Sequence, residues 1–365
     1  MRRVPIVVRE NKRIDNPEDR RMSSSVANGK KQSWWSLVVW LVFPLVCLTS
    51  CSMEDVRDAC CESVVLQYRY ISKGKDMYAQ FVHTERRFLF DSNGKFMYEV
   101  PVDSTHRPIV RLRRLPKGTY SMLTIGNRTE KGSYLDAMKP GITSLQEITL
   151  ALGRRTADQQ AFANAEELFW NLRTFDARCK QTCTYLCDMA NLHCYLHVKI
   201  GWEGDLPLGS DRYTLELSKL LPRYRMEINP KYTLEVKGKA PNGADRNEPT
   251  PNYSVHHYPY APAPHDAVVR TVNSLRGREL FYEVRTLRYL NEAIPTLQVW
   301  HDGVQLFKRP IDLTPIFKDW GWYPNLNPEQ VYRIELRILK SGQVEVKPWV
   351  SGSVLDWEDG GNFGG

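Results

Sequence analysis

Residues 63–72 read Ser-Val-Val-Leu-Gln-Tyr-Arg-Tyr-Ile-Ser, and their apolar and polar side chains alternate. The side chains on one side of an extended chain are Val64, Leu66, Tyr68 and Tyr70, and those on the other include Gln67 and Arg69. Alternation with a period of two predicts a β-strand with one buried face. Because several later stretches repeat this pattern, we expect the chain to be mainly all-β.

Three hairpins are predicted from short turn sequences between apolar runs. The first turn, residues 91–94, ends in Asn-Gly, and both residues accept the positive φ angles that a tight hairpin requires. The other two turns lie at residues 301–303 and 340–342 and end in glycine. Residues 115–125, Leu-Pro-Lys-Gly-Thr-Tyr-Ser-Met-Leu-Thr-Ile, predict one more turn followed by a strand.

The middle of the chain departs from simple alternation. Residues 158–172 fit a helix. The apolar side chains available for one face of this helix are Phe162, Leu168, Phe169 and Leu172. Strand character returns at residues 191–200, where every second side chain is apolar. Residues 242–265 are rich in proline and are predicted to form a long loop.

Two successive sets of alternating strands, separated by Gly and Pro turns, favour two tandem β-sandwich domains over a single barrel. The first domain is expected over residues 63–202, with the helix as a short insertion, and the second over residues 206–350. A polar, turn-rich stretch between them marks the boundary. Residues 351–365 are rich in glycine and are expected to form a flexible tail.

Residues 1–50 differ from the rest of the chain and are predicted to be a targeting segment. All of their charges lie before Trp34, and an uncharged, apolar run of about fifteen residues follows. A membrane-spanning helix needs about twenty apolar residues, so the run fits a secretory signal better than a permanent anchor. A start at Met1 and a start at Met22 are both compatible with this pattern.

The end of this segment, Leu48-Thr49-Ser50-Cys51, resembles the bacterial lipobox. In that motif the cysteine thiol is acylated before the chain is cleaved ahead of it. Cys51 would therefore be the lipid-bearing first residue of the mature protein. An ordinary signal peptide with a chance cysteine and a stop-transfer helix are the alternatives.

Residues 51–62 are expected to form a lipidated linker. Three polar residues directly after the lipid cysteine resemble the acidic export signal of surface-exposed lipoproteins of the Bacteroidetes, namely Ser52, Glu54 and Asp55. The alternative is an ordinary solvated linker. Together with the lipobox, this motif predicts a lipid-anchored protein of the cell outer membrane that faces the outside of the cell.

The mature chain is predicted to be nearly neutral. The whole sequence has a formal net charge of +8, and residues 1–50 carry nine Lys or Arg and four Asp or Glu. Without that segment the net charge is +3. No basic block remains in the sequence that would indicate a nucleic-acid partner.

Seven cysteines remain after export, and one of them is the lipidation candidate Cys51. The other six are candidates for up to three disulfides in an oxidising compartment: Cys60, Cys61, Cys179, Cys183, Cys187 and Cys194. Their pairing cannot be read from the sequence. The spacing of the last four also permits a structural zinc site. Because the compartment favours disulfides or buried thiols, no metal site is predicted.

Several of these motifs occur together in one known family. Cys60 precedes a first strand rich in tyrosine, and residues 90–96 form a Phe-Asp-x-x-Gly-x-Phe hairpin. The Leu-Pro-x-Gly-x-Tyr turn at residues 115–120 leads to Gly126-Asn127. With the acidic lipoprotein start, this pattern closely resembles the FimB-type fimbrial anchors and minor fimbrillin lipoproteins of Bacteroidales. The motifs cover about residues 45–130, and strand order extends the resemblance loosely to residue 349.

The resemblance implies two transthyretin-like β-sandwiches and a role in a pilus that assembles by donor-strand addition. Lipidated members of the family hold the shaft to the outer membrane, end its growth, or serve as accessory or tip subunits. The chain departs from the family pattern in the paired Cys60 and Cys61, in the cysteine cluster at residues 179–187, and in its long basic leader.

Two further groups of residues could bind ligands: the histidines His256, His257 and His265, and the aromatic residues Trp300, Trp320, Trp322 and Tyr323. The histidines are predicted to lie in an exposed loop rather than to bind metal. The aromatic residues are predicted to anchor sandwich edges or an interface rather than to stack on sugars. Asp103-Ser104-Thr105 resembles a short O-glycosylation acceptor. No catalytic pair or phosphate loop is recognisable, so an enzyme is not expected.

The sequence therefore predicts an outer-membrane lipoprotein that anchors or terminates a fimbria on the cell surface. Its expected partners are pilin subunits, joined by β-strand addition, and the membrane, joined through lipid. No cofactor is expected besides the lipid on Cys51. In this interpretation the strand at residues 64–71 stays in place and blocks a further donor strand. A tip or accessory adhesin, or a surface glycan-binding lipoprotein with a host or glycan ligand, are the alternatives.

Overall fold

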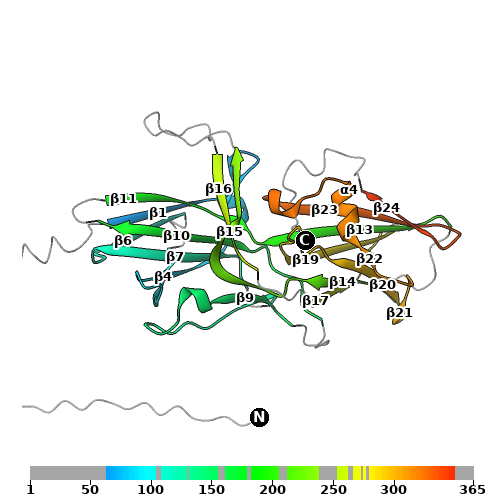
Figure 1. The fold of residues 1–365 in the computed structure, drawn as a ribbon, viewed down its shortest axis with the longest axis horizontal. Coiled ribbons are helices and arrows are strands. Elements are labelled where there is room, and N and C mark those ends of the chain that lie inside the picture. Colours follow the sequence, from blue (N-terminus) through cyan, green and yellow to red (C-terminus); the bar gives the residue numbers. More distant parts are fainter. Residues whose placement is uncertain are drawn as a thin grey trace, which may run out of the picture. The chain divides into compact units, whose positions relative to one another are not determined.

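A computed structural model describes residues 63–103, 108–129, 131–154, 161–178, 182–204, 212–237, 253–261, 266–272, 274–276 and 279–349. Strands predominate in this part of the chain, which confirms the all-β prediction (Figure 1). The predicted signal segment, the lipidated linker and the glycine-rich tail lie outside the described residues. Among those that are described, no helix is both long and apolar enough to span a membrane.

The first half of the chain contributes two sheets that share one hydrophobic core. The three-stranded sheet has the order β11 (Thr182–Asp188), β1 (Ser63–Arg69) and β6 (Ile109–Arg113). The five-stranded sheet has the order β12 (Ala190–Asn191), β10 (Phe169–Ala177), β7 (Gly118–Gly126), β4 (Glu85–Phe90) and β5 (Phe96–Val100). Buried side chains from both sheets form this shared core, so the two sheets pack as a sandwich.

The predicted buried face of the first strand is confirmed. Val64, Leu66 and Tyr68 are at most 1 % exposed, whereas Gln67 is exposed. Tyr70 is also buried, although it lies just beyond the end of β1. A short hairpin of β2 (Ile71–Ser72) and β3 (Lys75–Asp76) and the helix α3 (Tyr78–Phe81) then connect β1 to β4.

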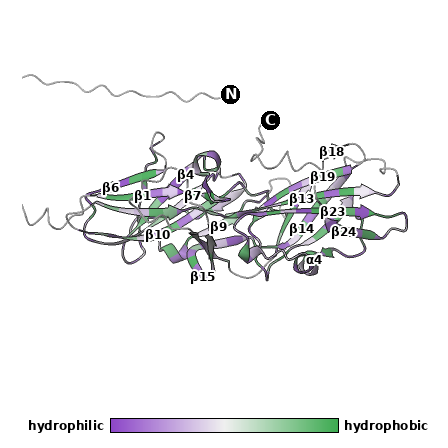
Figure 2. Cartoon of the chain, turned by 90° about the horizontal axis from the view of Figure 1, so that it is seen from above, coloured by the Kyte–Doolittle hydropathy of each residue, from purple (hydrophilic) through white to green (hydrophobic). Residues whose placement is uncertain are grey.

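A second pair of sheets shares the larger core. One has the order β18 (Ser274–Arg276), β19 (Glu279–Leu287), β13 (His193–Trp202), β23 (Gln330–Ile338) and β24 (Val344–Pro348). The other has the order β17 (Ala267–Val272), β14 (Tyr213–Leu220), β20 (Thr296–His301) and β21 (Val304–Gln305), with β22 (Ile311–Asp312) also paired to β20. Helix α4 (Leu313–Asp319) places Leu313 and Phe317 in this core. Apolar and polar residues alternate along these strands (Figure 2).

A further sheet draws strands from both halves of the sequence. Its order is β16 (Tyr253–Tyr260), β15 (Arg223–Lys237), β9 (Thr149–Leu152) and β8 (Ser133–Leu135). The single-turn helices η1 (Leu145–Glu147) and η3 (Pro324–Leu326) lie in the connections. β15 pairs with β9, so strands on either side of the predicted domain boundary are joined by backbone hydrogen bonds.

The helix predicted at residues 158–172 is wrong wherever the structure describes it. Residues 161–168 are not helical, and Phe169–Ala177 forms β10. β10 lies inside the five-stranded sheet, with Phe169 and Phe175 in the smaller core and Trp170 and Leu172 in the larger one. A strand buried on both faces is a continuous apolar run, and such a run resembles a helix when only the sequence is known.

Two other expectations need correction. β13 was expected in the first domain, but it pairs with β19 and β23 in the sheet of the second half. Within the predicted loop at residues 242–265, Tyr253–Tyr260 forms β16; residues 242–252 and 262–265 lie outside the described part of the chain. β16 is at the edge of its sheet, where a proline such as Pro259 is tolerated because the edge leaves some amide positions unpaired.

The three predicted hairpins are confirmed as β4–β5, β20–β21 and β23–β24. Each turn contains a glycine with positive φ: Gly94 at 70°, Gly303 at 77° and Gly342 at 81°. These are the conformations for which glycine has no steric cost. The alternate apolar residues from Leu192 to Ile200 are buried, as their pattern indicated, and His193 and His197 between them are buried as well.

Candidate functional site

Strand β1 occupies the centre of the three-stranded sheet. It pairs in parallel with β11 along its whole length, from Ser63 opposite Thr182 to Arg69 opposite Asp188. On its other side it pairs antiparallel with β6. β1 therefore fills the space between β6 and β11, over the five-stranded sheet. We refer to this space as the β1 groove.

The groove is apolar where β1 begins. Val64 and Leu66 are fully buried and belong to the smaller core. The core members contributed by the strands around them include Leu89, Val110, Leu112, Met122 and Phe175. Burial of such side chains is the main favourable term that holds a strand in place, at about 1.5–3 kcal/mol for each aliphatic side chain.

The groove is polar where β1 ends. Tyr68 is 1 % exposed, and its phenol oxygen accepts a hydrogen bond of 2.8 Å from the Thr124 hydroxyl. The Arg87 guanidinium carbon lies 4.9 Å from the centroid of the Tyr68 ring. Arg87 is itself buried and donates from Nε to Glu85 Oε2 at 2.7 Å. Burial is the main reason why the pKa of Tyr68 is raised well above its usual value, so the phenol is neutral.

The exposed side of β1 is fixed to β11 by side chains. Arg69 forms a two-pronged ion pair with Asp188, and both side chains are largely buried. At the other end, the hydroxyls of Ser63 and Thr182 lie 2.9 Å apart. Paired guanidinium–carboxylate contacts add geometric specificity as well as energy. These contacts hold β1 in a single register against β11.

Two of the motifs that carry the family resemblance lie close to the groove, and Tyr120 of one of them belongs to the smaller core. The Tyr120 hydroxyl donates to the Pro116 carbonyl at 2.9 Å and closes the Leu-Pro-x-Gly-x-Tyr turn. Asn127 has a φ of 59°, and its Oδ1 accepts from the amides of His83 and Thr84 at 2.7 and 3.2 Å. Its Nδ2 donates to the Phe81 carbonyl. The Asn therefore ties β7 to the segment that follows α3.

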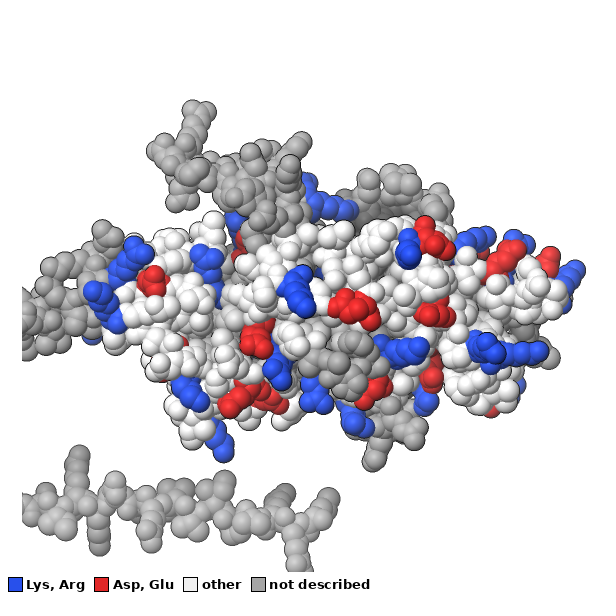
Figure 3. All heavy atoms as spheres, in the orientation of Figure 1, with Lys and Arg blue, Asp and Glu red and all other residues white. Residues whose placement is uncertain are grey.

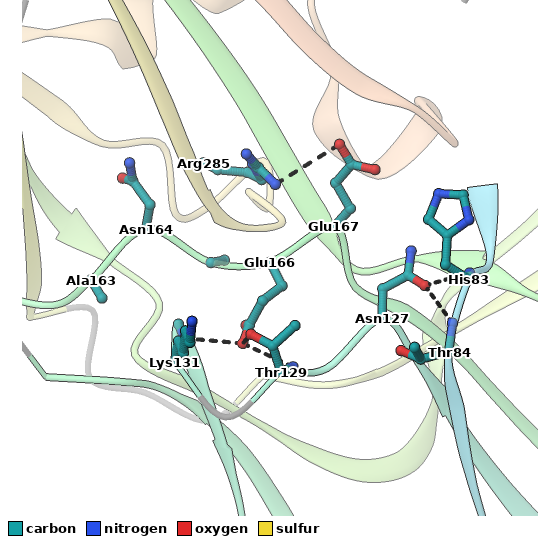
Figure 4. A pocket seen from close by; sticks show the side chains of 12 residues that line it. His83, Thr84, Asn127, Thr129, Lys131, Ala163, Asn164, Glu166, Glu167 and Arg285 are labelled. Carbon is teal, nitrogen blue, oxygen red and sulfur yellow. Dashed lines mark hydrogen bonds and ion pairs between the residues drawn. The ribbon is translucent and has the colours of Figure 1, made fainter. Parts of the chain in front are cut away.

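A cleft of about 540 Å³ lies next to Asn127, between the β7 end and β19 (Figure 4). Its carboxylates are bonded to neighbours inside the protein. Glu166 accepts from the Thr129 hydroxyl at 2.9 Å and from the Gly132 amide at 3.0 Å. Burial opposes ionisation of Glu166, but such hydrogen bonds outweigh it and lower its pKa. Glu167 and Arg285 point toward one another at 3.8 Å.

Acidic and basic side chains are interspersed over the described part of the face drawn in Figure 3. Among the described residues, Lys199 contacts Glu279 at 3.4 Å and Glu335 at 3.2 Å on the neighbouring strands. This distribution agrees with the nearly neutral mature chain expected from the sequence.

The residues predicted for lipidation and export lie outside the described residues: Leu48, Thr49, Ser50, Cys51, Ser52, Glu54 and Asp55. So do Cys60, Cys61, Cys179 and His265. The three described cysteines are not joined to one another by disulfides: Cys183, Cys187 and Cys194. Cys183 is partly exposed on β11, whereas the other two are buried. Disulfides that involve the other cysteines stay a prediction.

Cys187 and Cys194 should resist alkylation in the native protein. Burial raises the pKa of the Cys187 thiol to about 12 and also raises that of Cys194, so almost no thiolate is present at neutral pH. Mass spectrometry after iodoacetamide treatment should show these two cysteines unmodified until urea unfolds the protein. Labelling of either at the rate of a peptide thiol, with the fold intact, would contradict this placement.

The prediction of an exposed histidine loop is wrong for His256, which is 1 % exposed on β16. His257 is half-buried. In the described part of the chain, no three His, Cys, Asp or Glu side chains are grouped as metal ligands. The prediction failed because prolines around β16 suggested a loop, although His256 and Tyr258 of this strand are buried.

The buried histidines should make stability fall in mild acid. Burial lowers the pKa of His193, His197 and His256 to about 4, against an ordinary value of 6.5. Between these values the unfolded chain binds more protons than the native one, so stability is full above about pH 6.5 and falls as the pH drops toward 4. The expected loss from pH 7.5 to 4.5 is on the order of 2 kcal/mol for each ring.

Urea unfolding at both pH values measures this loss. His256→Phe, which removes one of the three buried imidazoles, should reduce the pH dependence by about a third of the total. An unchanged dependence in that variant would rule out His256 as a contributor.

Two of the four aromatic residues singled out in the sequence pack against the protein interior, as predicted. Trp320 and Trp322 lie with ring centroids 4.9 Å apart and pack on the larger core. Trp322 also contacts Phe317, at 5.2 Å between centroids. Tyr323 is 46 % exposed. Of the predicted glycosylation acceptor, only Asp103 lies within the described residues.

Sequence reasoning missed Arg87, Thr124 and Glu85 beneath Tyr68. No local pattern marks them, because Arg and Glu are usually exposed and their burial here depends on β1 lying above them.

Comparison with known proteins identifies the family of the chain. A family model described as fimbrillin-A associated anchor proteins Mfa1 and Mfa2 matches residues 57–354. A search of curated proteins finds no match.

Solved structures with similar folds include the fimbrial anchor protein Mfa2 from Porphyromonas gingivalis, with a TM-score of 0.54 and 13 % identity, over 80 % of this chain and 98 % of that one. A candidate polysaccharide-binding protein from Bacteroides thetaiotaomicron has a TM-score of 0.56 and 15 % identity, over 80 % of this chain and 99 % of that one. A candidate adhesin from Bacteroides ovatus has a TM-score of 0.56 and 14 % identity, over 80 % of this chain and 96 % of that one. At these identities the likeness shows a shared fold.

Proposed function

The chain belongs to the family of fimbrillin-A associated anchor proteins, and from this premise we propose that it is a lipid-anchored subunit that ends a fimbria at the outer membrane. Membership makes it a fimbrial accessory protein of the cell surface rather than a member of an enzyme family. The proposal adds three steps: lipidation at Cys51, joining to pilin subunits by β-strand addition, and retention of β1 as a stop.

The lipid supplies attachment. Cys51 follows a lipobox-like sequence and lies twelve residues before Ser63, the first residue of β1. Each buried acyl CH₂ contributes about 0.8 kcal/mol, so two or more chains hold a protein durably at a membrane. The link from lipid to folded sheet is short, and a load on the fimbria would pass through β1.

The position of β1 carries the proposal that growth ends here. In β-strand addition, an incoming strand bonds to an open sheet edge and fills pockets with alternate side chains. In this chain β1 already bonds to β6 and β11 and fills the pockets with Val64, Leu66 and Tyr68. A donor strand therefore has no open position in the β1 groove.

A strand-uptake experiment tests the stop. The probe is a fluorescent peptide of residues 63–72, added to the purified chain with Cys51→Ala. The matched control is the same chain with a specific protease site at the exposed β2–β3 turn, where Lys73 has a φ of 48°, cut so that β1 can leave. The intact chain should exclude the peptide, and the cut chain should take it up. Equal uptake by both would show that β1 is no stop.

A further inference from the structure

We propose that the polar end of the β1 groove selects the strand that the groove holds, and that it requires a tyrosine at the position of Tyr68. This inference rests on the proposed function, because it concerns the same groove. The apolar end would accept any aliphatic strand of suitable size. The polar end makes the distinction.

The Tyr68 hydroxyl is the partner of a buried group that no aliphatic side chain can serve. Thr124 is fully buried on β7, and its hydroxyl donates to the Tyr68 oxygen at 2.8 Å. A strand with leucine or phenylalanine at this position would take that acceptor away inside the core. A buried donor that loses its partner weakens binding by about tenfold or more.

The Tyr68 ring covers a buried charge. Arg87 is 1 % exposed, and its guanidinium carbon lies 4.9 Å from the ring centroid. Glu85 compensates the charge from one side, at 2.7 Å, and the ring covers it from another. The electron-rich face of an aromatic ring attracts a cation, and this attraction grows when water is excluded. An aliphatic side chain would cover the guanidinium without that attraction.

The register contacts keep the tyrosine over this position. Arg69 is held by Asp188 of β11, next to Tyr68 in the ladder. A shift of one residue would turn the buried side chains of β1 to the outer face. A shift of two residues would place Leu66 or Tyr70 over Arg87 and would break the Arg69–Asp188 pair. A matching strand therefore carries aliphatic side chains at positions 64 and 66, tyrosine at 68 and arginine at 69.

The apolar end has no such requirement. Val64 and Leu66 are fully buried members of the smaller hydrophobic core, where exchanges that conserve volume are tolerated. A groove that β1 has left would therefore rebind its own strand, or a strand of the same pattern, in preference to a purely aliphatic donor strand. This preference would keep the anchor subunit closed among competing pilin strands.

Competition for the cut chain tests the selection. Unlabelled peptides of residues 63–72 displace the fluorescent one, and the series contains the natural sequence, Tyr68→Phe, Tyr68→Leu and the exposed-face control Gln67→Ala. We expect Tyr68→Phe to compete about tenfold more weakly and Tyr68→Leu weaker still. Gln67→Ala should stay within about twofold.

A second comparison separates selection from general loss of packing. In the cut chain with Thr124→Val, the preference for Tyr over Phe should fall from about tenfold to near onefold, because the hydroxyl partner is gone. Equal competition by the Tyr and Phe peptides in the unaltered groove would overturn the inference, and this arm needs no groove variant to fold. That result would leave the proposal that β1 blocks a further donor strand intact. Uptake of the peptide by the uncut chain would instead overturn that proposal but not the preference for tyrosine at position 68.

Discussion

Leu66→Asp should unfold the protein or lower its free energy of unfolding by more than about 4 kcal/mol. Leu66 is fully buried in the middle of β1, between β6 and β11 and over the smaller core. A carboxylate there would have to leave water or carry a proton. A typical domain is stable by about 5–15 kcal/mol, so this single change removes much of the margin. Urea unfolding followed by circular dichroism measures the effect.

Gln67→Asp is the matched control for this experiment. It introduces the same side chain one residue later, on the exposed face of the strand. Its free energy of unfolding should stay within about 0.5 kcal/mol of the parent. Similar stability of the two variants would mean that β1 does not fill the groove, and the account of the stop would fail with it.

Arg288→Met should lower the free energy of unfolding by about 3–5 kcal/mol, which is the second large effect expected. Arg288 is 3 % exposed and follows β19. Its guanidinium donates to four backbone carbonyls, those of Asn191, Pro324, Asn327 and Pro328. Its carbon also lies 4.1 Å from the centroid of the Tyr258 ring. Methionine fills similar space but removes all four of these donated hydrogen bonds.

Arg285→Met controls for the loss of a positive charge three residues earlier, on β19. Arg285 is partly exposed, with Glu167 at 3.8 Å, and exposed ion pairs contribute about 0–1 kcal/mol. Its removal should therefore change the unfolding midpoint little. A loss from Arg288→Met no larger than that from Arg285→Met would show that the four carbonyl contacts do not join β12 to η3 and the residues after it.

The parts of the fold that follow local rules were predictable from the sequence. β1 alternates because one face is buried, and its buried residues were identified correctly. The hairpin turns were recognised because positive φ favours glycine at Gly94, Gly303 and Gly342.

The parts that depend on distant neighbours were not predictable. β10 has cores on both sides, so its apolar residues carry no period of two. β13 pairs with strands about ninety and one hundred and forty residues away in sequence, and nothing local shows this (Figure 1).

The β1 groove likewise combines features that follow from local sequence with features that depend on distant residues. The family resemblance and the alternation indicated that β1 is the strand of interest. The selective end was hidden, because Arg87 and Thr124 are ordinary residues until β1 covers them. Arg288 is likewise a lone arginine in the sequence, and only the convergence of four carbonyls explains its burial.

The most direct test of the anchor is Cys51→Ala in the native host, followed by membrane fractionation and electron microscopy of the fimbriae. If the lipid on this cysteine holds the subunit that ends the fimbria, the protein should leave the membrane fraction, and fimbriae should be shed into the medium and be longer. Fimbriae that remain attached, with normal length, would contradict base anchoring and favour a tip or glycan-binding role.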